Sequence, residues 1–203
     1  MKILSLGAIL LSLSTVAASA NALHLNPQQP GLKANMQTFG KTSIPIGYYE
    51  FCKRNQDRCS MREKRKKLKL TRRAWQQLTS VNWEINTKIE PVTDMDNFGM
   101  KEFWTYPVSK GDCEDYALLK RKTLHAKGVP LSSLLVTVVY DAKGGGHAVL
   151  TVVTDRGDYI LDNQVAKVLR WQDAELTYVK RQSAMMMPVS FLPRLILFFI
   201  AAS

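Results

Sequence analysis

The chain has 203 residues, a formal net charge of +11, three cysteines and three histidines. This length allows one domain with a sizeable hydrophobic core, while the absence of a second cysteine or a histidine close to Cys113 in the sequence excludes a zinc-type site there. The densest basic stretch has no interleaved aromatic residues, which argues against nucleic acid as the partner.

The N-terminus has the pattern of a secretory signal peptide over residues 1–22. Lys2 and a mainly apolar run, residues 3–13, precede two small-residue cleavage sequences, Ala18-Ser19-Ala20 and Ala20-Asn21-Ala22. The apolar run is short for a transmembrane anchor. We therefore expect export to the periplasm, where disulfides persist, and a mature chain of about 180 residues.

The cysteines follow an extended lead-in, residues 23–50, which is rich in proline, glycine and asparagine. Cys52 and Cys59 lie within a short segment that a disulfide can close in an exported protein. Cys113 is then left over. Such a cysteine forms an intermolecular bridge, is a buried passive thiol, or is reactive.

Residues 53–73 form a basic block with eleven Lys or Arg against Asp57 and Glu63, a net charge of +9. One interpretation is a solvated, partly helical face. The other is an electrostatic landing surface for an acidic partner, either a protein or an anionic lipid leaflet.

The remaining elements alternate between helical and strand patterns. Apolar residues at spacings of three and four predict a helix over 71–89, which Pro91 ends, and an aromatic-rich loop over 92–110 follows. A second helix is predicted over 112–127, with a C′ glycine and a proline after it. Three strands follow, and an antiparallel meander after helices predicts an α+β fold. The strand-like runs are 134–140, 148–154 and 159–162.

The tail, residues 184–203, is apolar and carries two prolines. Its uninterrupted apolar run after Arg194 is too short to span a bilayer. A buried final element, an interfacial segment and a divergent end all fit this pattern, so its role stays open.

Cys113, His147 and Asp162 occur in the order of a nucleophile, a base and an orienting carboxylate. At the start of the second helix, free N–H groups and the helix dipole favour thiolate over thiol. His147 would form an ion pair with that thiolate and later protonate the leaving group, and Asp162 would orient the imidazole. The Cys113 N–H would help to bind the oxyanion.

Strand register sets a condition on this triad. A two-residue turn at Arg156-Gly157 is expected to pair Asp162 with Thr151. His147 would then lie four residues away along the strand, at about 13 Å. Contact between His147 and Asp162 would need a longer loop, a bulge or a strong twist.

Asp112, Glu114 and Asp115 crowd negative charge around the thiol, and that charge alone raises the pKa of a thiol. A bound cation would neutralise it, and hard oxygen ligands indicate calcium rather than zinc. The alternative is that the three carboxylates only cap and solvate the helix start.

Several motifs, taken together, indicate a resemblance to one known protein family. They are Phe51-Cys52 to Cys59, Val81-Asn82-x-x-Ile85-Asn86, Gly111-Asp112-Cys113-Glu114-Asp115-Tyr116, Gly146-His147-Ala148-Val149-Leu150 and Ile160-Leu161-Asp162-Asn163. As a set, they resemble the bacterial transglutaminase-like cysteine peptidases, relatives of the LapG-type periplasmic proteases that cut large surface adhesins.

The resemblance implies a papain/transglutaminase-like domain over 23–183, with helices packed on an antiparallel sheet. It implies Cys113, His147 and Asp162 as the triad, and calcium dependence through the acidic residues that flank the nucleophile. In the LapG type, the substrate is a giant adhesin cut at a small-residue site, and an inner-membrane cyclic-di-GMP receptor sequesters the protease. The basic block and the tail have no counterpart in this resemblance.

The leading hypothesis is thus a periplasmic, calcium-dependent cysteine endopeptidase with a protein substrate, such as a surface adhesin, and an inner-membrane regulatory receptor. Acyl transfer to an amine, as in a transglutaminase or an amidase, passes through the same thioester and stays open. A non-catalytic binding protein on the same fold, using the basic block, also stays open. We expect no nucleic-acid partner.

Overall fold

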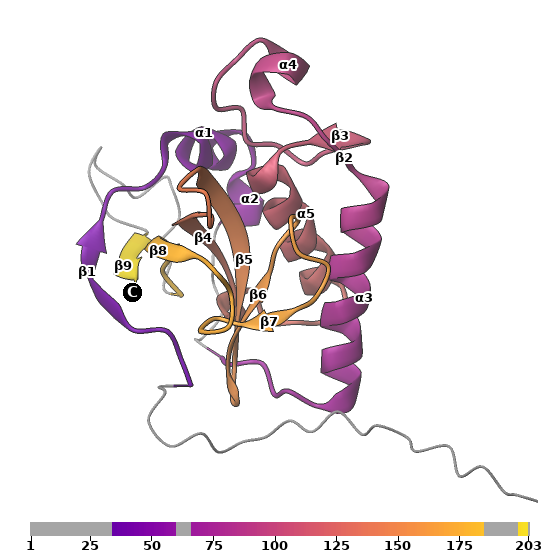
Figure 1. Ribbon diagram of the computed structural model, residues 1–203, viewed down its shortest axis with the longest axis vertical. Helices are drawn as coiled ribbons and strands as arrows, with labels where there is room; N and C mark the ends of the chain where they lie inside the picture. Colours follow the sequence, from indigo (N-terminus) through magenta and orange to yellow (C-terminus); the bar gives the residue numbers. More distant parts are fainter. Residues whose placement is uncertain (1–33, 60–65, 185–198, 203) are drawn as a thin grey trace, which may run out of the picture. The chain divides into compact units, whose positions relative to one another are not determined.

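A seven-stranded antiparallel sheet forms the centre of the computed structural model, which describes residues 34–59, 66–184 and 199–202 (Figure 1). The strand order is β1-β9-β8-β4-β5-β6-β7. Two shorter strands, β2 (Glu90–Pro91) and β3 (Lys110–Gly111), pair in parallel beside it. The strands of the main sheet are β1 (Thr38–Thr42), β4 (Leu134–Tyr140), β5 (Gly146–Thr154), β6 (Gly157–Leu161), β7 (Leu169–Arg170), β8 (Thr177–Gln182) and β9 (Phe199–Ala202).

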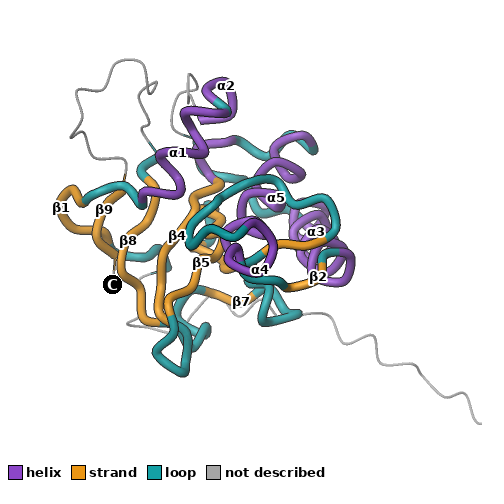
Figure 2. Tube along the Cα trace, turned by 90° about the horizontal axis from the view of Figure 1, so that it is seen from above, coloured by secondary structure: helices purple, strands orange, loops and turns teal. Residues whose placement is uncertain are grey.

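The helices are α1 (Ile46–Arg54), α2 (Gln56–Cys59), α3 (Arg72–Lys88), α4 (Asp94–Phe98) and α5 (Cys113–Ala126), with a 3₁₀ helix at Leu131–Ser133. Figures 1 and 2 both show α5 between the sheet and α3. Helices packed on an antiparallel sheet confirm the predicted α+β fold. Within the described residues, no helix combines the length and apolar character that crossing a membrane needs.

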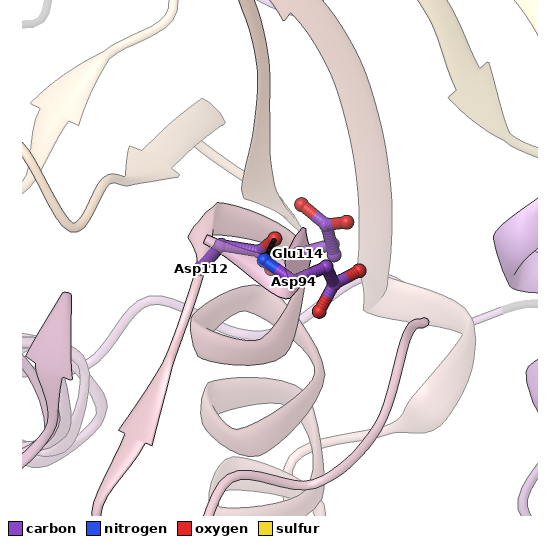
Figure 3. Close-up of side chains that lie close together, drawn as sticks. All are labelled: Asp94, Asp112 and Glu114. Atoms are coloured by element: carbon purple, nitrogen blue, oxygen red, sulfur yellow. Dashed lines mark hydrogen bonds between the residues drawn. The ribbon is translucent and has the colours of Figure 1, made fainter. Parts of the chain in front are cut away.

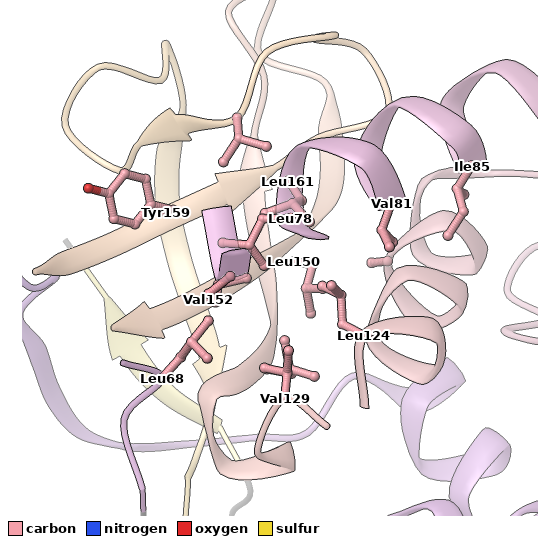
Figure 4. Close-up of a cluster of buried hydrophobic side chains, with 14 of the residues drawn as sticks. Leu68, Leu78, Val81, Ile85, Leu124, Val129, Leu150, Val152, Tyr159 and Leu161 are labelled. Atoms are coloured by element: carbon pink, nitrogen blue, oxygen red, sulfur yellow. The ribbon is translucent and has the colours of Figure 1, made fainter. Parts of the chain in front are cut away.

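The helix α3 forms where the apolar periodicity predicts it. Thr71 caps its N-terminus, because the Thr71 hydroxyl accepts a hydrogen bond from the Ala74 N–H at 3.1 Å. The apolar stripe faces inward and packs with α5, β5 and β6 in one core cluster (Figure 4). That cluster includes Leu78, Val81, Ile85, Leu124, Leu150, Val152, Tyr159 and Leu161.

The register of β5 and β6 differs from the prediction. The two-residue turn is Asp155-Arg156, because Thr154 pairs with Gly157, and the last pair is Leu150 with Leu161. Gly157 has a φ of +120°, and a Cβ there would come within 2.5 Å of the Ala34 carbonyl oxygen, so glycine is required. The expected pairing of Asp162 with Thr151 is therefore wrong by two residues.

The two ends of the described chain meet in the main sheet. β9 lies between β1 and β8, and Thr38 pairs with Ala202. The predicted signal peptide and residues 185–198 of the tail lie outside the described residues. The end of the tail is thus a strand of the sheet, and Ala202 is buried.

Cys52 and Cys59 are joined by a disulfide that links α1 to α2, and both are buried. The basic block continues after residues 60–65, which lie outside the described part. There Leu68 forms a bridge to Thr154 of β5. The cationic residues of this described stretch are exposed: Lys66, Lys67, Lys69, Arg72 and Arg73.

Candidate active site

Cys113 is the first residue of α5, and the preceding β3 strand fixes its position. β3 pairs with β2, which follows α3, so the end of α3 and the start of α5 are tied together. Gly111 is needed in β3 because a Cβ there would lie 2.8 Å from Asp115 Oδ2. The Cys113 side chain is thus held at a helix N-terminus, where the dipole favours negative charge.

The thiol has one hydrogen-bond partner among the described residues. Cys113 Sγ donates to Glu114 Oε2 at 3.0 Å. Burial raises the pKa of the Cys113 thiol, and the charge and hydrogen bond of Glu114 raise it further, whereas the backbone of Ala148 lowers it. In this arrangement the neutral thiol is favoured over the thiolate.

His147, near the start of β5, and Asp162, just after the end of β6, form a buried pair at one end of these neighbouring strands. His147 Nε2 lies 2.9 Å from Asp162 Oδ1, and both side chains are almost fully buried. Extending the β5–β6 register by one residue puts Asp162 opposite Val149, two residues from His147. Diagonal neighbours at this spacing share a face and are within reach of each other, so the ordinary two-residue turn is enough for contact.

The structure brings two members of the predicted triad into direct contact and places the third beside them. Among the described residues, no hydrogen bond joins Cys113 to His147. Ala148, which follows His147 on β5, lies close enough to the sulfur for its backbone to lower the pKa of the Cys113 thiol. The His147 ring bonds Asp162 through Nε2, which leaves Nδ1 as the nitrogen that can exchange a proton with the thiol.

Three carboxylates converge at the start of α5. Asp94, Asp112 and Glu114 each offer one oxygen, and these oxygens lie within 4.8 Å of one another (Figure 3). Asp94 comes from the first turn of α4, which forms within the predicted loop 92–110. The sequence interpretation named Asp112 and Glu114 but missed Asp94, which lies far from Cys113 in the chain.

Asp115, the third predicted ligand, does not belong to this group of oxygens. Its Oδ1 accepts a hydrogen bond from the Thr105 N–H at 2.7 Å. In the same way, Asp94 Oδ2 accepts from the Phe103 N–H. Asp115 therefore ties the segment between α4 and β3 to α5, and Asp94 ties the same segment to α4.

The acidic residues raise one another's pKa values. Burial and then the charge of Asp112 raise the pKa of Glu114 to about 8. Burial, opposed by the Thr105 N–H, raises the pKa of Asp115 to about 8. Burial and then the charge of Asp94 raise the pKa of Asp112. This cluster of carboxylates is electrostatically unfavourable when no cation balances it.

The donor set fits a hard cation. All three groups offer oxygen ligands, the type that calcium prefers. Asp94 Oδ1 and Asp112 Oδ1 are also buried without a hydrogen-bond partner among the described residues. Unpartnered buried oxygens at the point where three carboxylates converge are consistent with a cation as the missing partner.

Two further residues near Asp162 carry no assigned role from the sequence. Asn86 Nδ2 donates to the Asp162 carbonyl at 2.8 Å. Lys120 of α5 has no exposed surface, and burial lowers the pKa of Lys120 to about 7, an effect that the charge of Asp162 opposes. Asn86 belongs to the Val81-Asn82-x-x-Ile85-Asn86 motif, so the sequence contained a signal for it. Nothing in the sequence indicated a role for Lys120.

Comparisons with known proteins give one family match and several structural matches. A sequence model of the bacterial transglutaminase-like cysteine proteinases matches residues 38–189. Calcium-bound LapG of Legionella pneumophila is 31% identical, covering 52% of this chain and 62% of LapG, with a TM-score of 0.46. Another LapG structure from that organism is 30% identical over 55% of this chain and 66% of LapG, with a TM-score of 0.48. The chain thus spans less than two thirds of these two relatives, and no curated protein matches it.

Proposed function

The chain belongs to the bacterial transglutaminase-like cysteine proteinases, and we propose that it is a cysteine endopeptidase with Cys113, His147 and Asp162 as its triad. The observation that carries this proposal is the buried 2.9 Å contact between His147 Nε2 and Asp162 Oδ1. A buried imidazole–carboxylate pair beside a thiol at a helix N-terminus is the arrangement that activates a cysteine nucleophile.

Each member then has one role in peptide hydrolysis. His147 Nδ1 takes the thiol proton, and the Cys113 sulfur attacks the scissile carbonyl carbon. The C–N bond breaks as His147 returns the proton to the leaving amine, and a thioester remains on Cys113. Water, deprotonated by His147, then hydrolyses that thioester and restores the thiol. Asp162 keeps the ring oriented and stabilises the imidazolium form.

Calcium dependence is part of the proposal. Asp94, Asp112 and Glu114 would hold the ion, which would supply positive charge beside the nucleophile. Glu114 otherwise opposes thiolate formation, because its charge and its hydrogen bond both raise the pKa of the Cys113 thiol. Neutralising this carboxylate favours the ion pair between Cys113 and His147.

Membership of this family also supports proposals for the substrate, the partners and the location of the protein. We propose a protein substrate of the surface-adhesin type, an inner-membrane regulatory receptor and a periplasmic location after removal of residues 1–22. The exposed part of the basic block, from Lys66 to Arg73, is proposed to contact an acidic surface.

The test compares wild type with Cys113→Ala and Cys113→Ser, with calcium present. Wild type should cleave a recombinant fragment of a surface adhesin from the same cell, and iodoacetamide should label Cys113 at neutral pH. Both variants should lose cleavage while their free energy of unfolding stays within about 1 kcal/mol of wild type.

Three outcomes would contradict the endopeptidase. Cleavage by the alanine variant would exclude Cys113 as the nucleophile. Incorporation of a fluorescent primary amine without hydrolysis would indicate an acyl transferase. Failure of iodoacetamide to label the folded protein faster than a free thiol peptide would indicate a non-catalytic binding protein.

A further inference from the structure

Two asparagines of α3 hold the chain segment that begins at Asp162. Asn86 Nδ2 donates to the Asp162 carbonyl at 2.8 Å. One helical turn earlier, Asn82 Nδ2 lies 3.3 Å from the Val165 carbonyl and 3.1 Å from the Ala166 carbonyl. Residues four apart share one face of a helix. The two amides, here called the asparagine clamp, therefore hold one continuous segment from a single face of α3.

Asn82 occupies a position that favours an apolar residue, whereas Asn86 is half-buried. Asn82 has no exposed surface and belongs to the buried stripe of α3 that also contains Leu78 and Ile85. The Oδ1 atoms of Asn82 and Asn86 are buried without a hydrogen-bond partner among the described residues. Unpaired buried acceptors destabilise a fold, and an apolar side chain would avoid that cost. Packing alone therefore does not explain the amide of Asn82, nor the buried, unpaired Oδ1 of Asn86.

Asp162 needs support from outside the sheet. The last pair of the β5–β6 ladder is Leu150 with Leu161, so Asp162 lies just beyond the last paired residue. Asp162 Oδ1 accepts from the Gln164 N–H at 2.8 Å, a bond within the same segment. The Asn86 bond to its carbonyl is what ties its backbone to a helix. The position of the carboxylate opposite His147 thus depends on the clamp.

We propose that Asn82 and Asn86 are positioning residues, which set the backbone at residues 162–166 so that Asp162 meets His147 Nε2. The inference rests on the proposed function, because it concerns the same triad. Without the clamp, the helix still packs, but the segment after β6 is free to shift, and the His147 ring loses its fixed orientation. The reactivity of Cys113 then falls although the thiol itself is unchanged.

The test uses the folded full chain with calcium present, and its variants are Asn86→Leu, Asn86→Asp and Asn82→Leu. Asn86→Asp keeps the shape of the side chain and removes the donor, so it replaces the leucine variant if that one unfolds. Gln76→Leu is the control, since it removes an exposed amide from the same helix. Melting temperatures show which variants are folded.

Two readouts separate positioning from packing. The first is the exchange rate of the His147 Nε2–H proton with water, measured by nuclear magnetic resonance on protein with ¹⁵N-labelled histidine. The chain has three histidines, so His147→Ala assigns the signal. The second is the rate of Cys113 alkylation by iodoacetamide. Both Asn86 variants should speed the exchange and slow the alkylation by about tenfold, Asn82→Leu should do so less, and Gln76→Leu should do neither.

The outcomes distinguish the clamp from the triad. Folded Asn86 variants with wild-type exchange and alkylation rates would overturn the positioning role. If wild-type Cys113 reacts no faster than a free thiol peptide, the proposed function fails, while the His147 proton exchange still tests the clamp. Equal losses in Gln76→Leu would show a general effect on α3 and would also overturn the inference.

Discussion

Glu114 is the residue at which the nucleophile and the acidic cluster meet. Its Oε2 accepts the hydrogen bond of the Cys113 thiol, and the same side chain belongs to the group formed with Asp94 and Asp112. One carboxylate therefore restrains the thiol in its neutral form and also offers a ligand for a cation. This double position explains why residues beside a nucleophile would carry so much negative charge.

Asp94 gives a test of the cation site that is independent of the sequence prediction, because only the structure places it with Asp112 and Glu114. Asp94→Asn keeps the size of the side chain and its acceptor for the Phe103 N–H, and removes one charge. We expect calcium affinity, measured by calorimetric titration of metal-stripped protein, to fall at least about tenfold. Calcium should raise the melting temperature of wild type, because it binds the folded state.

Asp96→Asn is the matched control, since Asp96 lies on the same short helix, is exposed and is outside the group of three. Its calcium affinity should equal that of wild type. No heat of calcium binding at millimolar concentration in wild type would mean that the three carboxylates only cap and hold the start of α5. Magnesium should bind less tightly than calcium, because it requires stricter octahedral geometry.

The pKa values of Glu114 and Asp115 predict an unusual pH dependence of stability. Both are raised, from 4.5 and 3.8 to about 8. The folded state then binds more protons than the unfolded state between these values. The free energy of unfolding should therefore fall as pH rises from about 5 to about 8.

Denaturant titrations in EGTA across this pH range would measure the slope. Glu114→Gln should reduce it, because one of the two groups no longer titrates. Calcium should reduce it as well, because a bound cation favours the ionised carboxylate. A free energy of unfolding that increases with pH in EGTA would contradict the raised pKa values.

At the scale of elements, the disulfide between α1 and α2 closes a short loop around Cys52 and Cys59. Replacing both with serine should lower the free energy of unfolding by roughly 2–3 kcal/mol, because the unfolded chain regains the entropy of that loop. Denaturant titration measures the loss, with Cys113→Ser as the single-thiol control. An intact mass showing two free thiols at these positions, after periplasmic expression, would contradict the bridge.

The helices and strands that could be predicted are those whose signals lie in their own sequence. The helix over 71–89 follows from its apolar period and its Thr71 cap, and the strand over 134–140 is found with the predicted bounds. The turn between β5 and β6 was misplaced by one residue, because Gly157 lies in the strand with a positive φ rather than in the loop. That single residue decides whether Asp162 can reach His147.

In the candidate site as well, residues with local sequence signals were predicted, and those that depend on distant contacts were not. Cys113, His147 and Asp162 were predicted as a set from their order and their places beside helices and strands, and the structure brings His147 into contact with Asp162. Asp94 could not be predicted, because it reaches the site only through the packing of α4 against the start of α5. Asp115 resembled a ligand in the sequence, but its Oδ1 is bonded to the Thr105 N–H, a contact that depends on the path of a loop.

At the scale of the whole molecule, the net charge of +11 predicts salt-dependent association with acidic surfaces. Replacing Lys66, Lys67 and Lys69 with glutamine should weaken binding to vesicles that contain anionic phospholipid by about 1 kcal/mol for each lysine near the surface. Wild-type binding should disappear at about 1 M salt, where screening is nearly complete. Co-sedimentation measures both effects.

The control variant changes the same charge elsewhere: Lys88, Lys101 and Lys127 are exposed and lie outside the basic block. Replacing these three with glutamine should weaken binding less. Equal losses in the two variants would show that total charge, rather than the basic block, determines the association. Equal binding of wild type to zwitterionic vesicles would rule out an electrostatic surface altogether.

The pairing of β1 with β9 also affects the order in which the sheet can fold. Every other strand of the main sheet can find its neighbour among residues 134–182, but β1 pairs only with residues 199–202 in the described sheet. Contacts between such distant parts of a chain form slowly, because a long loop must close first. The ribosome must therefore release the chain as far as residue 202 before this edge can assemble. For the proposed exported protein, this delay would have no cost, because a chain that crosses a membrane unfolded begins to fold only after synthesis.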